Sequence, residues 1–116
     1  MASAGGDWKD MYYAAERGDV ACVRFHLSEG VDVNYQHPEA MMSALVISIL
    51  NGHTEVVHLL LEHGADANLP AELGPLTPLQ AAAQQQRADL QSLLQQFGAQ
   101  PTLPPQPSFW QRWLPL

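Results

Sequence analysis

The chain has 116 residues, an apolar fraction of 47% and a formal net charge of −7. This length suits one small domain with a single core, and this apolar content argues against wholesale disorder. Residues 1–74 hold 11 acidic and 3 basic side chains, whereas residues 75–116 hold 1 acidic and 2 basic side chains. A nucleic-acid-binding protein needs a basic face, which the sequence lacks, so its acidity favours a protein partner with a basic surface.

The sequence contains no signal for a membrane or an oxidising compartment. Cys22 is the single cysteine, so it cannot form an intramolecular disulfide. Residues 1–11 have no apolar segment of the kind found in secretion signals. The longest mostly apolar run, Met41 to Leu50, has about half the length that a bilayer span requires. We therefore expect a soluble, monomeric, cytoplasmic protein that does not bind membranes.

A period of 34 residues runs through the chain. The positions in register are Gly30, Gly64 and Gly98, and then Gly18, Gly52 and Gln86. Segments 32–34 (DVN) and 66–68 (DAN) also match. We expect Asn34 and Asn68, a residue type that tolerates left-handed backbone, to form hydrogen bonds within their own loops. A period that spans two helices and two glycine stops predicts three stacked copies of one unit, an all-α fold with a shared core.

The helices expected in each copy follow from their caps. The first copy opens with residues 9–13 (KDMYY), which suits a terminal unit facing water. In the second copy, Ser43 caps a helix that ends at Leu50, and Thr54 begins a helix that ends before Gly64. In the third copy, Thr77 and Pro78 start a helix. Its second helix turns Leu90, Leu93 and Leu94 inward and has glutamines elsewhere, which is typical of a C-terminal cap.

The residues of these copies resemble the ankyrin-repeat family. The resemblance lies in segments 77–82 (TPLQAA), 52–61 (GHTEVVHLLL) and 64–68 (GADAN), and it extends from about Lys9 to Pro101. It implies an all-α solenoid of helix–turn–helix units with hairpin-like loops. The expected organisation is an N-terminal arm (1–8), an N-capping repeat (9–41), a second repeat (42–74), a C-capping repeat (75–100) and a Pro-rich linker with an aromatic tail (101–116).

The resemblance also implies non-enzymatic binding of a protein partner through a concave face, with the chain acting as an inhibitor, an immunity-type protein or a regulatory subunit. Carried over by register, the inner-helix positions are Glu16, Arg17, Leu50, Asn51, Gln84 and Gln85, and the loop-tip positions are Glu39, Ala40, Met42, Leu73, Gly74 and Leu76. Met42, Leu50, Leu73 and Leu76 are large apolar residues where solvent favours polar ones, which indicates a contact surface. An alternative is that one loop folds inward and hides its leucines.

The end of the chain allows three interpretations. Residues 101–107 should form an extended linker that leads to Phe109, Trp110 and Trp113. The preferred interpretation is a tail that folds back and covers the last repeat. The second is a motif that recruits a partner through Trp110 and Trp113, which would make the chain an adaptor or scaffold. The third is contact with a membrane interface, which the single basic residue of the tail, Arg112, disfavours.

Catalytic and metal-binding chemistry finds little support in the sequence. His58 and Glu62 lie four residues apart beside His63, but no second pair of ligands has a suitable spacing, so we interpret them as a solvated helix face. Cys22 has no evident base and fits a small core position, and His53 is interpreted as a structural residue. We expect no catalytic residue, no metal and no cofactor. A metal- or thiol-dependent enzyme is the alternative of another class.

Overall fold

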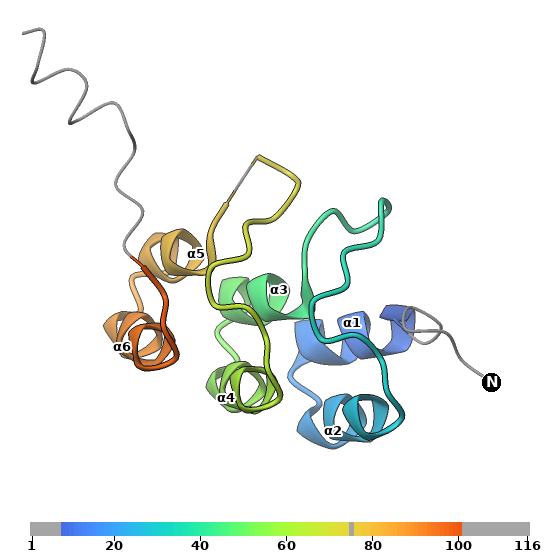
Figure 1. Ribbon diagram of the computed structural model, residues 1–116. Helices are drawn as coiled ribbons and strands as arrows, with labels where there is room; N and C mark the ends of the chain where they lie inside the picture. Colours follow the sequence, from blue (N-terminus) through green and yellow to red (C-terminus); the bar gives the residue numbers. More distant parts are fainter. Residues whose placement is uncertain (1–7, 75, 101–116) are drawn as a thin grey trace, which may run out of the picture.

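The structure is a computed structural model that describes residues 8–74 and 76–100. This part of the chain consists of α-helices and loops and contains no strand (Figure 1). The helices are α1 (Trp8–Arg17), α2 (Val20–Ser28), α3 (Ala44–Leu50), α4 (Thr54–Glu62), α5 (Pro78–Gln84) and α6 (Ala88–Gln96). The expected all-α fold is thereby confirmed.

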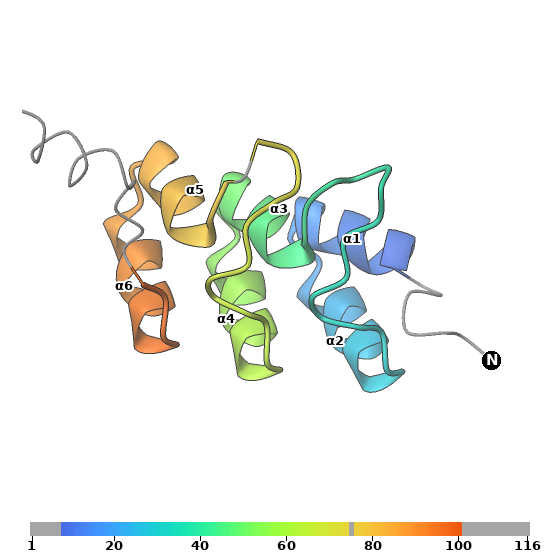
Figure 2. The ribbon, with the colours of Figure 1, turned by 45° about the horizontal axis from the view of Figure 1, so that its top comes forward.

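The helices form two rows. The inner row consists of α1, α3 and α5, and the outer row of α2, α4 and α6, with each inner helix packed on the outer helix that follows it (Figures 1 and 2). Two long loops extend on the side of the inner row, and we call them finger 1 (residues 31–43) and finger 2 (residues 65–77, with residue 75 not described). Each of the first two copies of the repeat is therefore one helix pair followed by one finger, and the described part of the third copy is the helix pair with residues 97–100.

The expected starts of α3, α4 and α5 are confirmed, and side-chain capping hydrogen bonds mark those of α3 and α5. The Val46 N–H donates to Ser43 Oγ at 3.3 Å, so Ser43 caps α3, and α4 begins at Thr54. Thr77 and Gln80 form a reciprocal capping box at the start of α5, where Pro78 occupies the first turn. Gly64 ends the helical part of the second unit, after α4, with a φ of +91°, a conformation that glycine adopts without strain.

The core is centred on the middle unit. Residues 44–49 of α3 are all buried, and so are five residues of α4, Val56, Val57, Leu59, Leu60 and Leu61. The first unit has fewer buried residues, and α5 contributes mainly Ala81 and Ala82. This distribution follows from the stacking, because only the middle unit has a neighbouring unit on both sides within the described residues.

The two ends of the stack differ in polarity. At the C-terminal end, Gln95 is exposed and Gln91 half-buried where the preceding repeat has the buried Leu61 and Val57, as expected for a cap. At the N-terminal end, Phe25 is 57% exposed, although its counterpart Leu59 is only 3% exposed. Leu59 lies beside α2, which belongs to the preceding unit. Phe25 belongs to the first unit, and the described residues include no preceding unit that could cover it.

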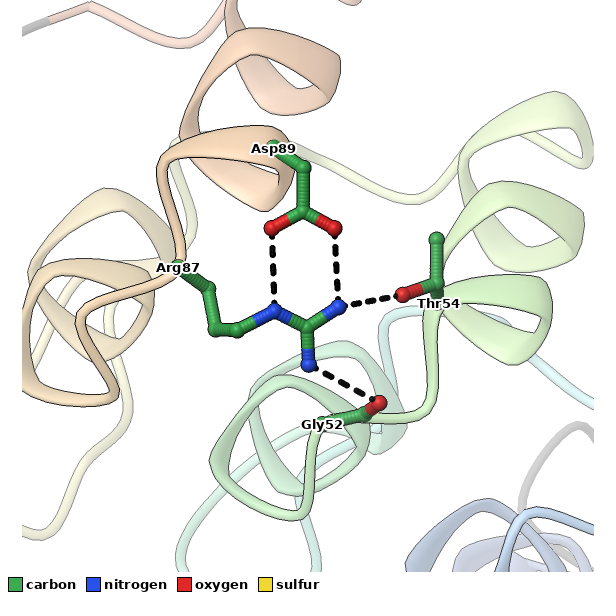
Figure 3. Close-up of polar contacts among 4 residues, drawn as sticks. All are labelled: Gly52, Thr54, Arg87 and Asp89. Atoms are coloured by element: carbon green, nitrogen blue, oxygen red, sulfur yellow. Dashed lines mark hydrogen bonds and ion pairs between the residues drawn. The ribbon is translucent and has the colours of Figure 1, made fainter.

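Successive units are joined at their turns by the same register position. The His53 Nε2–H donates to the Glu16 carbonyl at 2.8 Å, which supports the structural role expected of His53. Arg87 takes this position in the third unit and donates to the Gly52 carbonyl (3.3 Å) and Thr54 Oγ1 (2.7 Å) (Figure 3). Two further N–H groups of Arg87 donate to the two carboxylate oxygens of Asp89, at 2.9 and 2.8 Å.

The loops are joined by side-chain amides. Within their own loops, Asn34 and Asn68 form hydrogen bonds through their backbone N–H groups, which donate to Asp32 and Asp66. Their side chains form hydrogen bonds with the repeat that follows. The Asp66 N–H donates to Asn34 Oδ1 and the Gln100 N–H donates to Asn68 Oδ1, both at 2.7 Å. Each asparagine accepts from the unit that follows, so it contributes to stacking.

Candidate partner-binding face

The predicted inner-helix residues lie near the C-terminal ends of the inner helices, with unequal exposure. Glu16, Arg17, Asn51, Gln84 and Gln85 are exposed. Leu50 is half-buried and packs against the core, because the last residue of α3 still faces the neighbouring helices. Leu50 is therefore not the freely exposed apolar residue that the sequence suggested.

The finger residues divide in the same way. Leu73 is 57% exposed and Glu39 is exposed, whereas Met42 and Leu76 are half-buried and pack against the core. The Ala71 N–H donates to the Leu76 carbonyl at 2.7 Å, which holds the backbone of Leu76 in place. The alternative that one loop hides its leucines thus applies to Leu76 but not to Leu73. Trp110 and Trp113 lie outside the described residues.

The tips of the two fingers are hydrogen-bonded to each other. The Leu73 N–H donates to the Met41 carbonyl at 3.0 Å, and both side chains are exposed. Below this contact, the side-chain amide of Gln36 donates to the Pro70 carbonyl and accepts from the Glu72 N–H, at 3.1 and 3.2 Å. The fingers thereby form one surface, with Met41 and Leu73 adjacent at its edge.

A hollow of about 260 Å³ lies between α1 and finger 1. We call it the aromatic hollow, and it is lined by Trp8, Tyr12, Tyr13, Glu16, Glu39 and Ala40. Three of these residues, Glu16, Glu39 and Ala40, lie at positions that were expected from the sequence to belong to the partner-binding face. The structure brings Glu16 to one site with the other two, although it is far from them in the sequence, because finger 1 folds back over α1.

Aromatic rings that contact one another form and support one wall of the aromatic hollow. Trp8 stacks on His37 of finger 1, with ring centroids 4.3 Å apart and planes 7° apart. It also meets Tyr12 edge-on at 6.1 Å, and Tyr12 meets Tyr13 at 5.6 Å. Such contacts fix ring orientation and add to the burial energy of the rings. The wall therefore has a defined shape.

The charged groups among the lining residues of the aromatic hollow are the carboxylates of Glu16 and Glu39. Lys9 Nζ lies 3.4 Å from Glu39 Oε1, and it also lies 5.7 Å from the centre of the Trp8 ring. Among the described residues, no basic side chain is within ion-pair distance of Glu16. Burial raises the pKa of Tyr12, and the nearby negative charge of Glu16 raises it further. Both effects favour the neutral phenol, so the carboxylates set the charge of the site.

Trp8, Tyr12 and Tyr13 were not predicted as site residues. Residues 9–13 were interpreted only as a capping segment, and Trp8 was placed in an arm before the first repeat. The available signal was the spacing of Trp8 and Tyr12, because residues four apart lie on the same face of a helix. What the sequence could not indicate is that finger 1 would place His37 and Glu39 on that face.

The residues considered for catalysis do not form a site in the described part of the chain. His58 and Glu62 form an exposed pair on α4, with an N–O distance of 3.5 Å. Cys22 is half-buried against the core, and His26 is buried one turn further along α2. No group of three or more possible metal-ligating side chains is found among residues 8–74 and 76–100. Within these ranges, no helix has the length and apolarity to cross a bilayer.

Comparison with known families identifies the fold. A model of ankyrin repeats in three copies matches residues 11–104. The chain belongs to the ankyrin-repeat family. Ankyrin repeats generally mediate interactions between proteins and are not themselves enzymes, which agrees with the general function expected from the sequence.

Individual relatives are similar over parts of their length. The ankyrin-repeat domain from Acinetobacter baumannii AYE, known from a crystal structure, is 36% identical, with a TM-score of 0.71, and the match covers 78% of this chain and 47% of that chain. The cyclin-dependent kinase 4 inhibitor B of Bos taurus is 36% identical over 85 residues, which are 73% of this chain and 63% of that protein. The ankyrin repeat and SOCS box protein 6 of Mus musculus is 31% identical over 71 residues, which are 61% of this chain and 17% of that protein. The chain thus corresponds to less than two thirds of each relative.

Proposed function

We propose that the chain binds a protein partner through the face formed by α1 and the two fingers. The observation that carries this proposal is the exposure of two apolar side chains, Met41 and Leu73, on residues whose backbones are hydrogen-bonded to each other where the fingers meet. Exposed apolar groups beside polar ones are typical of contact surfaces. The aromatic hollow continues this surface along the chain, because its lining residues Glu39 and Ala40 directly precede Met41.

The partner that this face fits has a basic surface, and the chain acts as its inhibitor or regulatory subunit. The basic surface is supported by the net charge of −7 and by the carboxylates of Glu16 and Glu39. The regulatory role is supported by the similarity to a relative that is named as a kinase inhibitor. Electrostatic complementarity of this kind increases the rate of association and selects among partners.

The test is affinity capture from the native cell, comparing the wild-type chain with a Leu73→Glu variant. Phe25→Glu is a matched control, because Phe25 has the same exposed fraction of 57% but lies on α2 in the outer row. We expect a protein that wild type and Phe25→Glu retain and that Leu73→Glu loses, with equal melting temperatures for all three. Retention of the same protein by Leu73→Glu would refute a binding site at the finger tips.

The regulatory role requires a second measurement with the captured partner. Adding the purified wild-type chain in equimolar amount should change the activity of the partner, and Leu73→Glu should not. Stoichiometric binding that leaves the activity of the partner unchanged would contradict the inhibitor or regulatory role, while leaving the binding face itself supported.

A further inference from the structure

We propose that the aromatic hollow is a binding site for one basic side chain, arginine or lysine, presented by the protein partner. This inference rests on the proposed function, which it deepens by naming the chemical group that is recognised. Three features of the aromatic hollow support it, namely its lining, its size and the behaviour of a cation that the chain itself supplies.

The lining of the aromatic hollow suits a cation. The faces of tryptophan and tyrosine rings attract ammonium and guanidinium groups, and Trp8, Tyr12 and Tyr13 supply such rings at one site. Glu16 and Glu39 supply carboxylates, which form charge-assisted hydrogen bonds with the same groups. Among the described basic side chains, none is paired with Glu16, so this carboxylate is available to an incoming cation.

The size of the aromatic hollow suits one side chain. Sites for small molecules usually have volumes of roughly 300–1,000 Å³. The aromatic hollow, at about 260 Å³, lies below that range. It is open to solvent beside the exposed ring of Tyr13, which gives a side chain access from a docked surface.

The chain's own lysine shows that the rim of the aromatic hollow accepts a cation. Lys9 Nζ lies 3.4 Å from Glu39 Oε1 and 5.7 Å from the Trp8 ring centre, yet Lys9 is not among the lining residues. The ion pair is exposed, with 56% of the Lys9 side chain and 65% of the Glu39 side chain accessible. Exposed pairs contribute little free energy, so a partner's cation can displace Lys9.

A second hollow provides an internal control. It has a volume of about 250 Å³ and lies between α2 and α4, lined by Val20, Arg24, Glu55, His58, Leu59 and Glu62. It also has two carboxylates, but it lacks tryptophan and tyrosine and contains an arginine of its own. Attraction to acidic side chains in general would act at both hollows, whereas the proposed recognition acts only at the aromatic hollow.

The experiment is an NMR titration of the isotope-labelled full chain with N-acetyl-arginine amide, N-acetyl-lysine amide and the neutral N-acetyl-citrulline amide, at constant ionic strength. We expect the arginine and lysine compounds to shift the signals of Trp8, Tyr12, Tyr13 and Glu16 in a saturable manner. A dissociation constant on the order of millimolar is expected for a single side chain. Citrulline amide, and signals around Glu55 and Glu62, should show no saturable shift.

Three variants test the assignment. Glu16→Gln and Tyr13→Leu should each weaken binding of the arginine compound by about three- to tenfold, as expected for loss of one charge or ring contact. Glu62→Gln, in the second hollow, should leave the affinity unchanged. Lys9→Gln should tighten binding, because it removes the competing cation, and a role in folding alone would not produce this gain.

Equal shifts with citrulline amide, equal shifts at both hollows, or an unchanged affinity in Glu16→Gln would each overturn the proposal. These results do not depend on the identity of the partner. If the titration fails while Leu73→Glu still loses a captured protein, the binding face stands and the basic-side-chain site falls. If the titration succeeds and the capture of no protein depends on Leu73, the basic-side-chain site stands and the binding site at the finger tips falls.

Discussion

At the scale of single residues, Gln86 occupies a backbone position that the two preceding repeats give to glycine. Its φ is +56°, and Gly18 and Gly52 have φ values of +82° and +73° at the equivalent positions. Left-handed backbone costs an L-residue with a side chain about 1–2 kcal/mol relative to the right-handed form, and glycine does not have this cost. The third unit is therefore strained at the turn between its helices.

We expect Gln86→Gly to stabilise the protein by about 0.5–1 kcal/mol, after allowing for the greater freedom of glycine in the unfolded chain. Chemical denaturation with circular dichroism measures this change. Gln85→Gly is the matched control. Because Gln85 has a φ of −85°, the same replacement there should destabilise the protein. A loss of stability in Gln86→Gly would show that the glutamine side chain stabilises the turn.

Asp89, at the same turn, makes the folding stability of the protein depend on pH. The hydrogen bonds from Arg87 lower the pKa of Asp89 from 3.8 to about 2. Because this pKa is lower in the folded state, the pair stabilises the fold above about pH 4, and the stabilisation is lost as the pH falls from about 4 to 2. The effect is modest, since both side chains are partly exposed.

We expect Asp89→Asn to melt at a lower temperature than wild type at pH 6 and at nearly the same temperature at pH 2. Thermal melts between these pH values measure the difference. In an Arg87→Gln background the same replacement should have little effect at any pH, because the partner of the carboxylate is gone. A difference between wild type and Asp89→Asn that stays constant from pH 6 to pH 2 would be inconsistent with this assignment.

At the scale of elements, the loops are part of the stacking and not only connections. The side-chain amide of Asn68 accepts from the Gln100 N–H at 2.7 Å and donates to the Gly98 carbonyl at 3.1 Å. The second unit is thereby hydrogen-bonded at two points to the loop that follows α6. One repeat earlier, Asn34 Oδ1 likewise accepts from the Asp66 N–H. A hydrogen bond of this kind has a net value of about 0.5–1.5 kcal/mol.

We expect Asn68→Ala to lower the free energy of unfolding by about 1 kcal/mol and to speed hydrogen exchange of the Gln100 amide. Denaturation and amide exchange by NMR provide the two readouts. Asn51→Ala is the control, because Asn51 donates only to the Ile47 carbonyl within its own turn of α3. Unchanged protection of the Gln100 amide in Asn68→Ala would mean that this link between repeats is not formed in solution.

At the scale of the whole molecule, the three units depend on the core of the middle one. Leu60 of α4 and Ile49 of α3 are both fully buried in the middle unit, and α4 contacts α2 on one side and α6 on the other. In a repeat protein each unit contacts only its neighbours, so loss of the middle unit leaves two isolated helix pairs. Isolated pairs of such short helices are not stable.

We expect Leu60→Ala to lower the free energy of unfolding by about 2–5 kcal/mol and to lower the melting temperature of all three units together. Residue-resolved NMR during a thermal melt, with reporters such as Ala15, Val57 and Leu90, measures whether the units melt as one. Leu93→Ala in α6, a half-buried position, should cost less. First and third units that persist after the middle unit has melted would contradict a single shared core.

Much of the fold was determined by the sequence, because the signals involved are local. Ser43, Thr77 and Pro78 start helices through contacts within one turn, and Gly64 ends one because its backbone conformation suits glycine. The period of 34 residues then predicted that equivalent helices stack, and hence which helix faces are apolar. The general function, protein binding, followed from the resemblance that these local motifs carry.

Only the tertiary structure decided which side chains of the binding face are accessible and which lie together. Leu50 and Leu76 pack against the core while Leu73 is exposed, a difference that depends on how each finger folds. The aromatic hollow exists because finger 1 brings Glu39 to α1, and the asparagine links exist because consecutive loops are adjacent in space. These contacts join residues distant in the chain, and a sequence pattern specifies such contacts only through the packing of the whole stack.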